Sequence, residues 1–75
     1  MPELRSVSGH QAIKAPERLG FRQVRQRGSH VVLKKSTPAG HMGCVVPLHK
    51  QLKTGTLRGI LKLAKVEPED FLKNL

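Results

Sequence analysis

The sequence predicts an α+β fold in which helices cover one face of a three-stranded antiparallel sheet. Apolar residues recur at helical spacing towards both ends of the chain, the stretch between them has the pattern of short strands, and glycine-containing turns divide that stretch. The expected order is helix, three strands, helix and a short last helix. Because the chain has 75 residues, we expect one domain over residues 1–75.

The first helix is expected to begin near Gly9. Ser8 precedes Gln11 by three residues, which is the spacing of a capping box. Gly20 is expected to end the helix, because glycine adopts the left-handed conformation that follows many helices. Pro16 lies inside this span, so we expect a kink or two short helical pieces, since proline lacks the backbone N–H and clashes with the preceding turn.

Three strands are expected after Gly20. Residues 21–27 and 30–35 flank Gly28-Ser29, a two-residue link that suits a type II′ hairpin turn. Residues 42–47 are expected to form a third strand that ends at a proline. The segment 36–43 is rich in turn residues, and we expect its loop to be longer than a tight hairpin.

The helical period returns from Thr54 onwards. Its apolar residues stand at positions i, i+3, i+4 and i+7, which places them on one face of a helix. Pro68 is expected to open a short last helix, with acidic residues near its positive end. The apolar residues of the longer helix are Leu57, Ile60, Leu61 and Ala64.

The charge distribution predicts a polyanionic partner. Fourteen Lys and Arg against five Asp and Glu give a net charge of +9, and positions 18–66 contain no carboxylate. A field of one sign attracts phosphate backbones through counterion release. A basic surface that only keeps the protein soluble is the simpler interpretation. The cations within this stretch are Arg18, Arg22, Arg25, Arg27, Lys34, Lys35, Lys50, Lys53, Arg58, Lys62 and Lys65.

Composition also argues against several classes of protein. The chain has no apolar stretch of about 18 residues, and its helices carry too few aromatic residues for a membrane-surface anchor. A chain this short has no room for a large internal pocket, so we expect no small-molecule cofactor. The one cysteine forms no internal disulfide, and the N-terminus lacks a secretion signal, so we expect an intracellular, cytoplasmic protein.

His30 is the most informative of the four histidines. It directly follows the expected hairpin turn, on a strand flanked by Arg25, Arg27 and Lys34. An imidazole exchanges a proton near neutral pH, and nearby cations favour its neutral form. A neutral imidazole can accept the 2′-hydroxyl proton of RNA while the cations stabilise charge on the phosphate oxygens. The alternative is that His30 is a polar strand residue without a catalytic function.

A metal site is not favoured. His41, Cys44 and His49, with His30 across the sheet, are possible ligands, but their spacing matches no established zinc pattern. Mg²⁺ and Mn²⁺ prefer carboxylates, which the basic stretch lacks. If the protein cleaves a phosphodiester, we therefore expect it to do so without a metal.

Four sequence motifs together resemble the HicA family, the toxin half of HicA/HicB toxin–antitoxin pairs. The resemblance extends from about Ser8 to Leu72, in the same order and with the same spacing. The motifs are Leu19-Gly20-Phe21, Arg25-Gln26-Arg27-Gly28-Ser29-His30, Val46-Pro47-Leu48-His49 and Lys53-Thr54-Gly55-Thr56-Leu57-Arg58-Gly59-Ile60-Leu61.

The resemblance implies a fold similar to a double-stranded RNA-binding domain, endoribonuclease activity on messenger RNA and neutralisation by a HicB-type antitoxin. In that family the histidine of the Gly-Ser-His motif is catalytic, and here it is His30. We therefore expect a metal-independent mRNA endoribonuclease toxin with His30 as the catalytic residue. The expected RNA-binding residues, placed from the strands and the motifs, are Arg25, Arg27, Gly28, Ser29, Lys34, Lys35, His49 and Lys50.

Two other functions remain open at this point. A basic fold of this type can bind duplex RNA by shape without cleaving it, so a non-catalytic RNA-binding module is the main alternative. A DNA-binding accessory protein is less favoured, because the apolar stripe of the helix from Thr54 is needed for the core and no recognition helix is evident.

Overall fold

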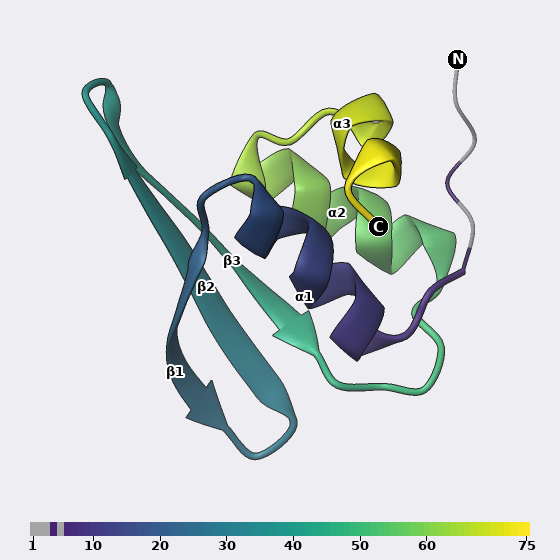
Figure 1. The fold of residues 1–75 in the computed structure, drawn as a ribbon. Helices are drawn as coiled ribbons and strands as arrows, with labels where there is room; N and C mark the ends of the chain where they lie inside the picture. The colour runs from purple at the N-terminus through teal and green to yellow at the C-terminus, as the bar shows by residue number, and fades with distance from the viewer. Residues whose placement is uncertain (1–3, 5) are drawn as a thin grey trace.

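The computed structural model describes Leu4 and residues 6–75, which have the predicted α+β architecture (Figure 1). Three strands form one open antiparallel sheet in the order β1-β2-β3, and the helices lie to one side of it. Within these residues, no helix is long and apolar enough to cross a membrane. The elements are α1 (Gly9–Arg18), β1 (Arg22–Arg27), β2 (His30–Thr37), β3 (Gly40–Pro47), α2 (Thr54–Ala64) and α3 (Pro68–Lys73).

The predicted capping box starts α1. The Gln11 N–H donates to Ser8 Oγ at 3.1 Å, and the Ser8 N–H donates to Gln11 Oε1 at 3.0 Å. Two backbone donors at the helix start are satisfied in this way. Gly9 follows the cap directly and packs against the end of β3, where its N–H donates to the His49 carbonyl oxygen at 2.9 Å.

The expectation that Pro16 divides α1 into two short helical pieces was wrong, because a single helix runs through it to Arg18. Pro16 lies in the last turn, its ring is fully buried, and its carbonyl oxygen accepts from the N–H groups of Leu19 (2.9 Å) and Phe21 (3.0 Å). The burial of the ring and these two hydrogen bonds offset the energetic cost of the backbone N–H that proline lacks. Gly20 follows with φ of 102°, and its N–H donates to Glu17 O, which completes a Schellman ending.

Both strand connections are two-residue turns. Gly28 has φ of 55° while Ser29 has no positive φ, which fits the predicted type II′ turn. The expectation of a longer loop after β2 was wrong: the ladder runs on to Thr37 and Gly40, with only Pro38 and Ala39 between them. Gly40 has φ of 132°, and Thr37 Oγ1 donates to its carbonyl oxygen at 2.9 Å, so local bonding closes the turn.

The two C-terminal helices begin where the sequence predicts. In α2 the buried residues are the four at helical spacing from Leu57 to Ala64, so its apolar stripe faces the core. Pro68 occupies the first turn of α3, and Glu69 and Asp70 lie near its positive end. Phe71 is 0% exposed and holds this short helix against the rest of the fold.

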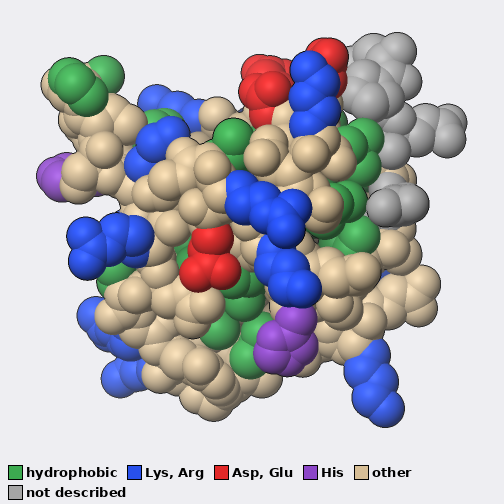
Figure 2. All heavy atoms as spheres, viewed as in Figure 1, with side chains coloured by type: hydrophobic (Ala, Val, Ile, Leu, Met, Phe, Trp, Pro, Cys, Tyr) green, Lys and Arg blue, Asp and Glu red, His purple; other side chains and the backbone are tan. Residues whose placement is uncertain are grey.

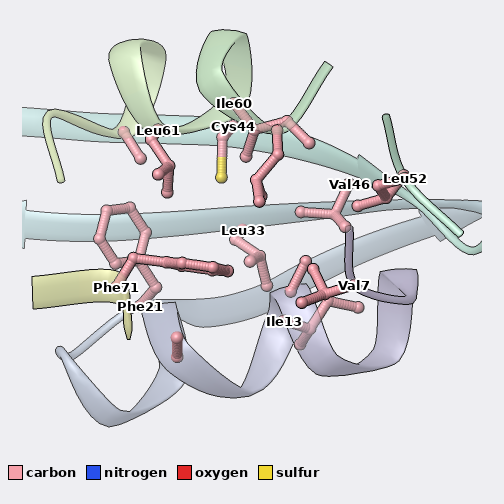
Figure 3. Close-up of a cluster of buried hydrophobic side chains, with 14 of the residues drawn as sticks. Val7, Ile13, Phe21, Leu33, Cys44, Val46, Leu52, Ile60, Leu61 and Phe71 are labelled. Carbon is pink, nitrogen blue, oxygen red and sulfur yellow. The ribbon is translucent and has the colours of Figure 1, made fainter. Parts of the chain in front are cut away.

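The three helices and the strands β2 and β3 share one hydrophobic core, whereas every residue of β1 is exposed. Figure 3 shows side chains of α1, α2 and α3 converging on the covered face of the sheet, where Leu33 of β2 lies in the middle. No polar or charged side chain is buried among the described residues. The helices therefore pack on one face of the sheet and stabilise the fold there, and no helix covers the opposite face.

Candidate nucleic-acid interface

The uncovered side of the sheet, here called the open face, carries His30. On β2 the side chains of Val31 and Leu33 point into the core, at 2% and 0% exposure, so the alternating residues His30, Val32 and Lys34 lie on the open face. His30 is exposed. An exposed imidazole on this face is what the predicted catalytic function requires, because a buried ring could not reach RNA.

The register of the sheet places three arginines on the same face. Residues directly opposite each other in an antiparallel ladder share a face. Arg22 pairs with Lys34, Arg25 with Val32 and Arg27 with His30. All the side chains of β1 are exposed, so these guanidinium groups are accessible.

A β-bulge makes this arrangement possible. Simple alternation would place Arg22 and Arg25 on opposite faces, since they are three residues apart. The register shifts between Gln23 and Arg25, so that Val24 is an extra residue and Arg22 joins the open face. The predicted set of RNA-binding residues omits Arg22, and only the observed bulge shows that it belongs beside Lys34.

The hairpin turn and the chain after β3 meet beside His30. His30 pairs with Pro47 of β3, and the Leu48 N–H donates to the Ser29 carbonyl oxygen at 2.6 Å. This bond ties the Gly28-Ser29 turn to the segment that holds His49. The structure thus brings His30, Arg27, Gly28-Ser29 and the backbone of His49 to one end of the sheet.

His49 and Lys50 are both exposed and follow β3 at that end. Leu48 packs against the core, and the His49 carbonyl oxygen accepts from Gly9 N–H at 2.9 Å. The segment is therefore held from two sides, by Ser29 of the hairpin and by Gly9 of α1.

Lys35 lies apart from the other predicted RNA-binding residues. It follows Lys34 on β2, so its side chain emerges on the helical side and is half-buried. Its Nζ donates to the Leu19 carbonyl oxygen at 2.7 Å and lies 5.9 Å from the centroid of the Phe21 ring. One of its three N–H donors is used within the fold, and the structure does not bring it to His30.

The open face is electrostatically one-sided. The register places Arg22, Arg25, Arg27 and Lys34 on this face and no Asp or Glu, and Figure 2 shows Lys and Arg side chains along the edge of the molecule where Figure 1 places the sheet. Within the described part of the chain, the single salt bridge joins Lys73 to Glu69 in α3. The arginines of β1 are thus not neutralised by a carboxylate contact there, and they are available to an anionic ligand.

The four residues considered as metal ligands lie in three separate places, with His30 and the backbone of His49 at one end of the sheet. His41 pairs with Ser36 near the far end of the sheet, whereas His49 follows the opposite end of β3. Cys44 pairs with Leu33 and is buried on the helical side, where burial raises the pKa of its thiol to about 11. A protonated thiol is a poor ligand and a poor nucleophile, so Cys44 acts as a core residue.

A known protein family matches most of the chain. The family described as HicA toxin of bacterial toxin–antitoxin systems matches residues 9–66, which cover α1, the whole sheet and α2. No curated protein and no solved structure matches the chain. The expected likeness to a double-stranded RNA-binding domain therefore stays a prediction. The match over most of the chain shows that this protein belongs to the HicA toxin family of bacterial toxin–antitoxin systems.

Proposed function

We propose that this toxin is a metal-independent endoribonuclease that cleaves messenger RNA with His30 as its catalytic residue. The observation that carries the proposal is the position of His30: it is exposed at one end of an open sheet face, opposite Arg27 in the ladder. Arg25, Lys34 and Arg22 lie along the same face and supply the positive charge that an RNA backbone requires.

The reaction needs a base beside the ribose and positive charge around the phosphate. A neutral His30 imidazole accepts the proton of a 2′-hydroxyl, and the freed oxygen attacks the adjacent phosphorus. The bond from phosphorus to the 5′-oxygen breaks, that oxygen takes up a proton from solvent, and a 2′,3′-cyclic phosphate remains. Arg27 and Arg25 stabilise the charge on the phosphate oxygens in the transition state.

The residue types on the open face support a reaction without a metal. Hard divalent cations need carboxylate or carbonyl oxygens, and the chain from Arg18 to Val66 contains no Asp or Glu. Histidine and arginine can supply both proton transfer and charge stabilisation. The turn residues Gly28 and Ser29, together with His49 and Lys50, complete the RNA-binding surface at the His30 end.

A HicB-type antitoxin is the partner that the family implies. A protein with a net charge of +9 is best silenced by an anionic surface laid over the open face. Such a cover would occupy the arginines of β1 and keep RNA from His30.

The test compares His30→Ala with a matched control, His10→Ala, on messenger RNA in EDTA. His10 is exposed on α1 and lies outside the sheet, so its loss removes an imidazole without touching the proposed site. His30→Ala should bind RNA, cleave it about 10²- to 10⁴-fold more slowly and no longer arrest growth when expressed. Equal cleavage by wild type and His30→Ala would refute the assignment.

A non-catalytic RNA-binding module is the second candidate, because an exposed basic sheet is sufficient to retain RNA. The same experiment separates the two functions. Retention of RNA without breakdown by the wild-type protein in EDTA would favour the binding module.

A further inference from the structure

A cationic hollow lies at the end of the sheet away from His30. It has a volume of about 680 Å³ and opens to solvent. Two register pairs line it, Arg22 with Lys34 and Ser36 with His41, and Val24, Lys35 and Gly20 complete the wall. Of these residues, only Lys34 and Lys35 were among the predicted RNA-binding residues.

The chemistry of the hollow suits a phosphate group. Two of its cationic residues, Arg22 and Lys34, lie on the open face, the third, Lys35, donates to the Leu19 carbonyl oxygen, and no carboxylate lines it. Ser36 Oγ lies 3.0 Å from His41 Nδ1, which fixes the imidazole and leaves its Nε2 as the ring atom that can contact a ligand. A hydroxyl, an imidazole and guanidinium and ammonium groups around one hollow can bind an anion from several sides.

Val24 adds an apolar contact beside this charge. As the extra residue of the bulge it is 53% exposed. A nucleotide offers both a phosphate and the apolar faces of its base, so a wall that combines Arg22 with Val24 matches a nucleotide better than it matches a free inorganic anion.

The hollow is too far from His30 for one phosphate to occupy both places. Four to six residues of β2 separate His30 from Lys34 and Ser36, which corresponds to about 13–20 Å at about 3.3 Å per strand residue. Both places lie on the open face, so a single extended strand of RNA can reach from one to the other.

We infer that the hollow is an anchoring subsite for a second backbone phosphate of the same single-stranded RNA, several nucleotides from the cleaved bond. Arg22, Lys34 and the Ser36–His41 pair hold this phosphate, and Val24 contacts its nucleotide. The inference rests on the proposed function, because it assumes that RNA lies on the open face with its reactive ribose at His30. It implies a minimum substrate length that His30 alone does not impose.

The test uses single-stranded RNA oligonucleotides lengthened one nucleotide at a time. Binding is measured in the His30→Ala background, which leaves the RNA uncut, and cleavage is measured in the otherwise wild-type protein. Arg22→Ala and His41→Ala probe the hollow. Arg58→Ala, an exposed arginine of α2 on the helical side, is the control with the same change of charge and size.

The subsite predicts a step in affinity at a threshold length. Above it, Arg22→Ala and His41→Ala should each weaken binding about three- to tenfold and raise KM with kcat unchanged, while Arg58→Ala has little effect. Arg22→Ala should also reduce the slope of log affinity against log salt concentration by about one, which corresponds to the loss of one phosphate contact. Below the threshold, His41→Ala should bind as the parent protein does, and Arg22→Ala should lose no more affinity than Arg58→Ala does.

Two results would overturn the subsite while leaving the proposed function intact. One is affinity that rises smoothly with length, and the other is an Arg22→Ala defect that is equal for short and long RNA or equal to that of Arg58→Ala. Failure of the parent proteins to bind or cleave RNA of any length would instead end both proposals.

Discussion

Gly9→Ala is expected to destabilise the protein, although the same change stabilises most helices. Gly9 is the first residue of α1 and lies against the end of β3. A Cβ at this position would overlap the carbonyl oxygen of Pro47 and lie 2.7 Å from the Cα of Leu48. Both of these are backbone atoms, so the clash cannot be relieved by turning a side chain.

The size of the effect follows from three terms. Forced separation of two packed backbones costs about 1–3 kcal/mol, and loss of the bond from Gly9 N–H to His49 O costs about 0.5–1.5 kcal/mol. The higher helix propensity of alanine returns at most about 1 kcal/mol. With about 1 kcal/mol returned by alanine, the net loss of unfolding free energy is about 0.5–3.5 kcal/mol, and each kcal/mol lowers Tm by about 4–8 °C in a domain of this size.

Gly59→Ala is the matched control, because Gly59 lies inside α2 and a Cβ there meets nothing within 4 Å. It should raise the unfolding free energy by about 0.5–1 kcal/mol. Thermal and urea unfolding followed by circular dichroism measure both variants. A Gly9→Ala protein as stable as Gly59→Ala would refute the proposed packing of α1 against the Pro47–His49 segment.

Three further predictions concern the cap, the core and the thiol. Ser8→Ala should cost about 0.5–2 kcal/mol in urea unfolding, since it removes one half of the capping box, and an unchanged midpoint would contradict that bonding. Phe71→Ala should lower the unfolding free energy by about 3–5 kcal/mol, which is a large part of the stability of so small a domain, even though Phe71 lies beyond the residues matched by the family. Phe71→Leu should retain most of the wild-type unfolding free energy. Burial raises the pKa of Cys44 from 9.0 to about 11, so the folded state holds this proton more tightly than the unfolded state does. The free energy of unfolding that the buried thiol contributes is full below pH 9 and is lost as the pH rises to about 11. Cys44→Ala should therefore show a shallower decline in unfolding free energy between these pH values. Equal slopes for the two proteins would contradict the prediction.

Elements with strong local signals could be predicted from the sequence. The capping box at Ser8 and the apolar stripe from Leu57 to Ala64 each act within one or two helical turns, so neighbouring residues determine them. The type II′ turn depends on one glycine with positive φ, and Gly28 supplies it. The face that carries His30 followed from simple alternation along β2.

The features that could not be predicted depend on contacts between distant residues. Pro16 remains within α1 because its ring is buried in the core, which composition near Pro16 does not reveal. The bulge at Val24 depends on pairing with β2, so Arg22 was not expected on the open face. Lys35 was expected at the RNA-binding surface, but its contact with the Leu19 carbonyl oxygen joins two segments that only the fold brings together.

Single-turnover cleavage of one RNA by wild-type protein and His30→Ala in EDTA, with the product ends read by mass spectrometry, tests the central claim most directly. The wild type should produce 2′,3′-cyclic phosphate and 5′-hydroxyl ends and should leave intact a linkage whose ribose lacks the 2′-hydroxyl, while His30→Ala should produce almost none of these ends. Cleavage of the 2′-deoxy linkage, 5′-phosphate products or an unchanged rate in His30→Ala would contradict proton removal by this imidazole.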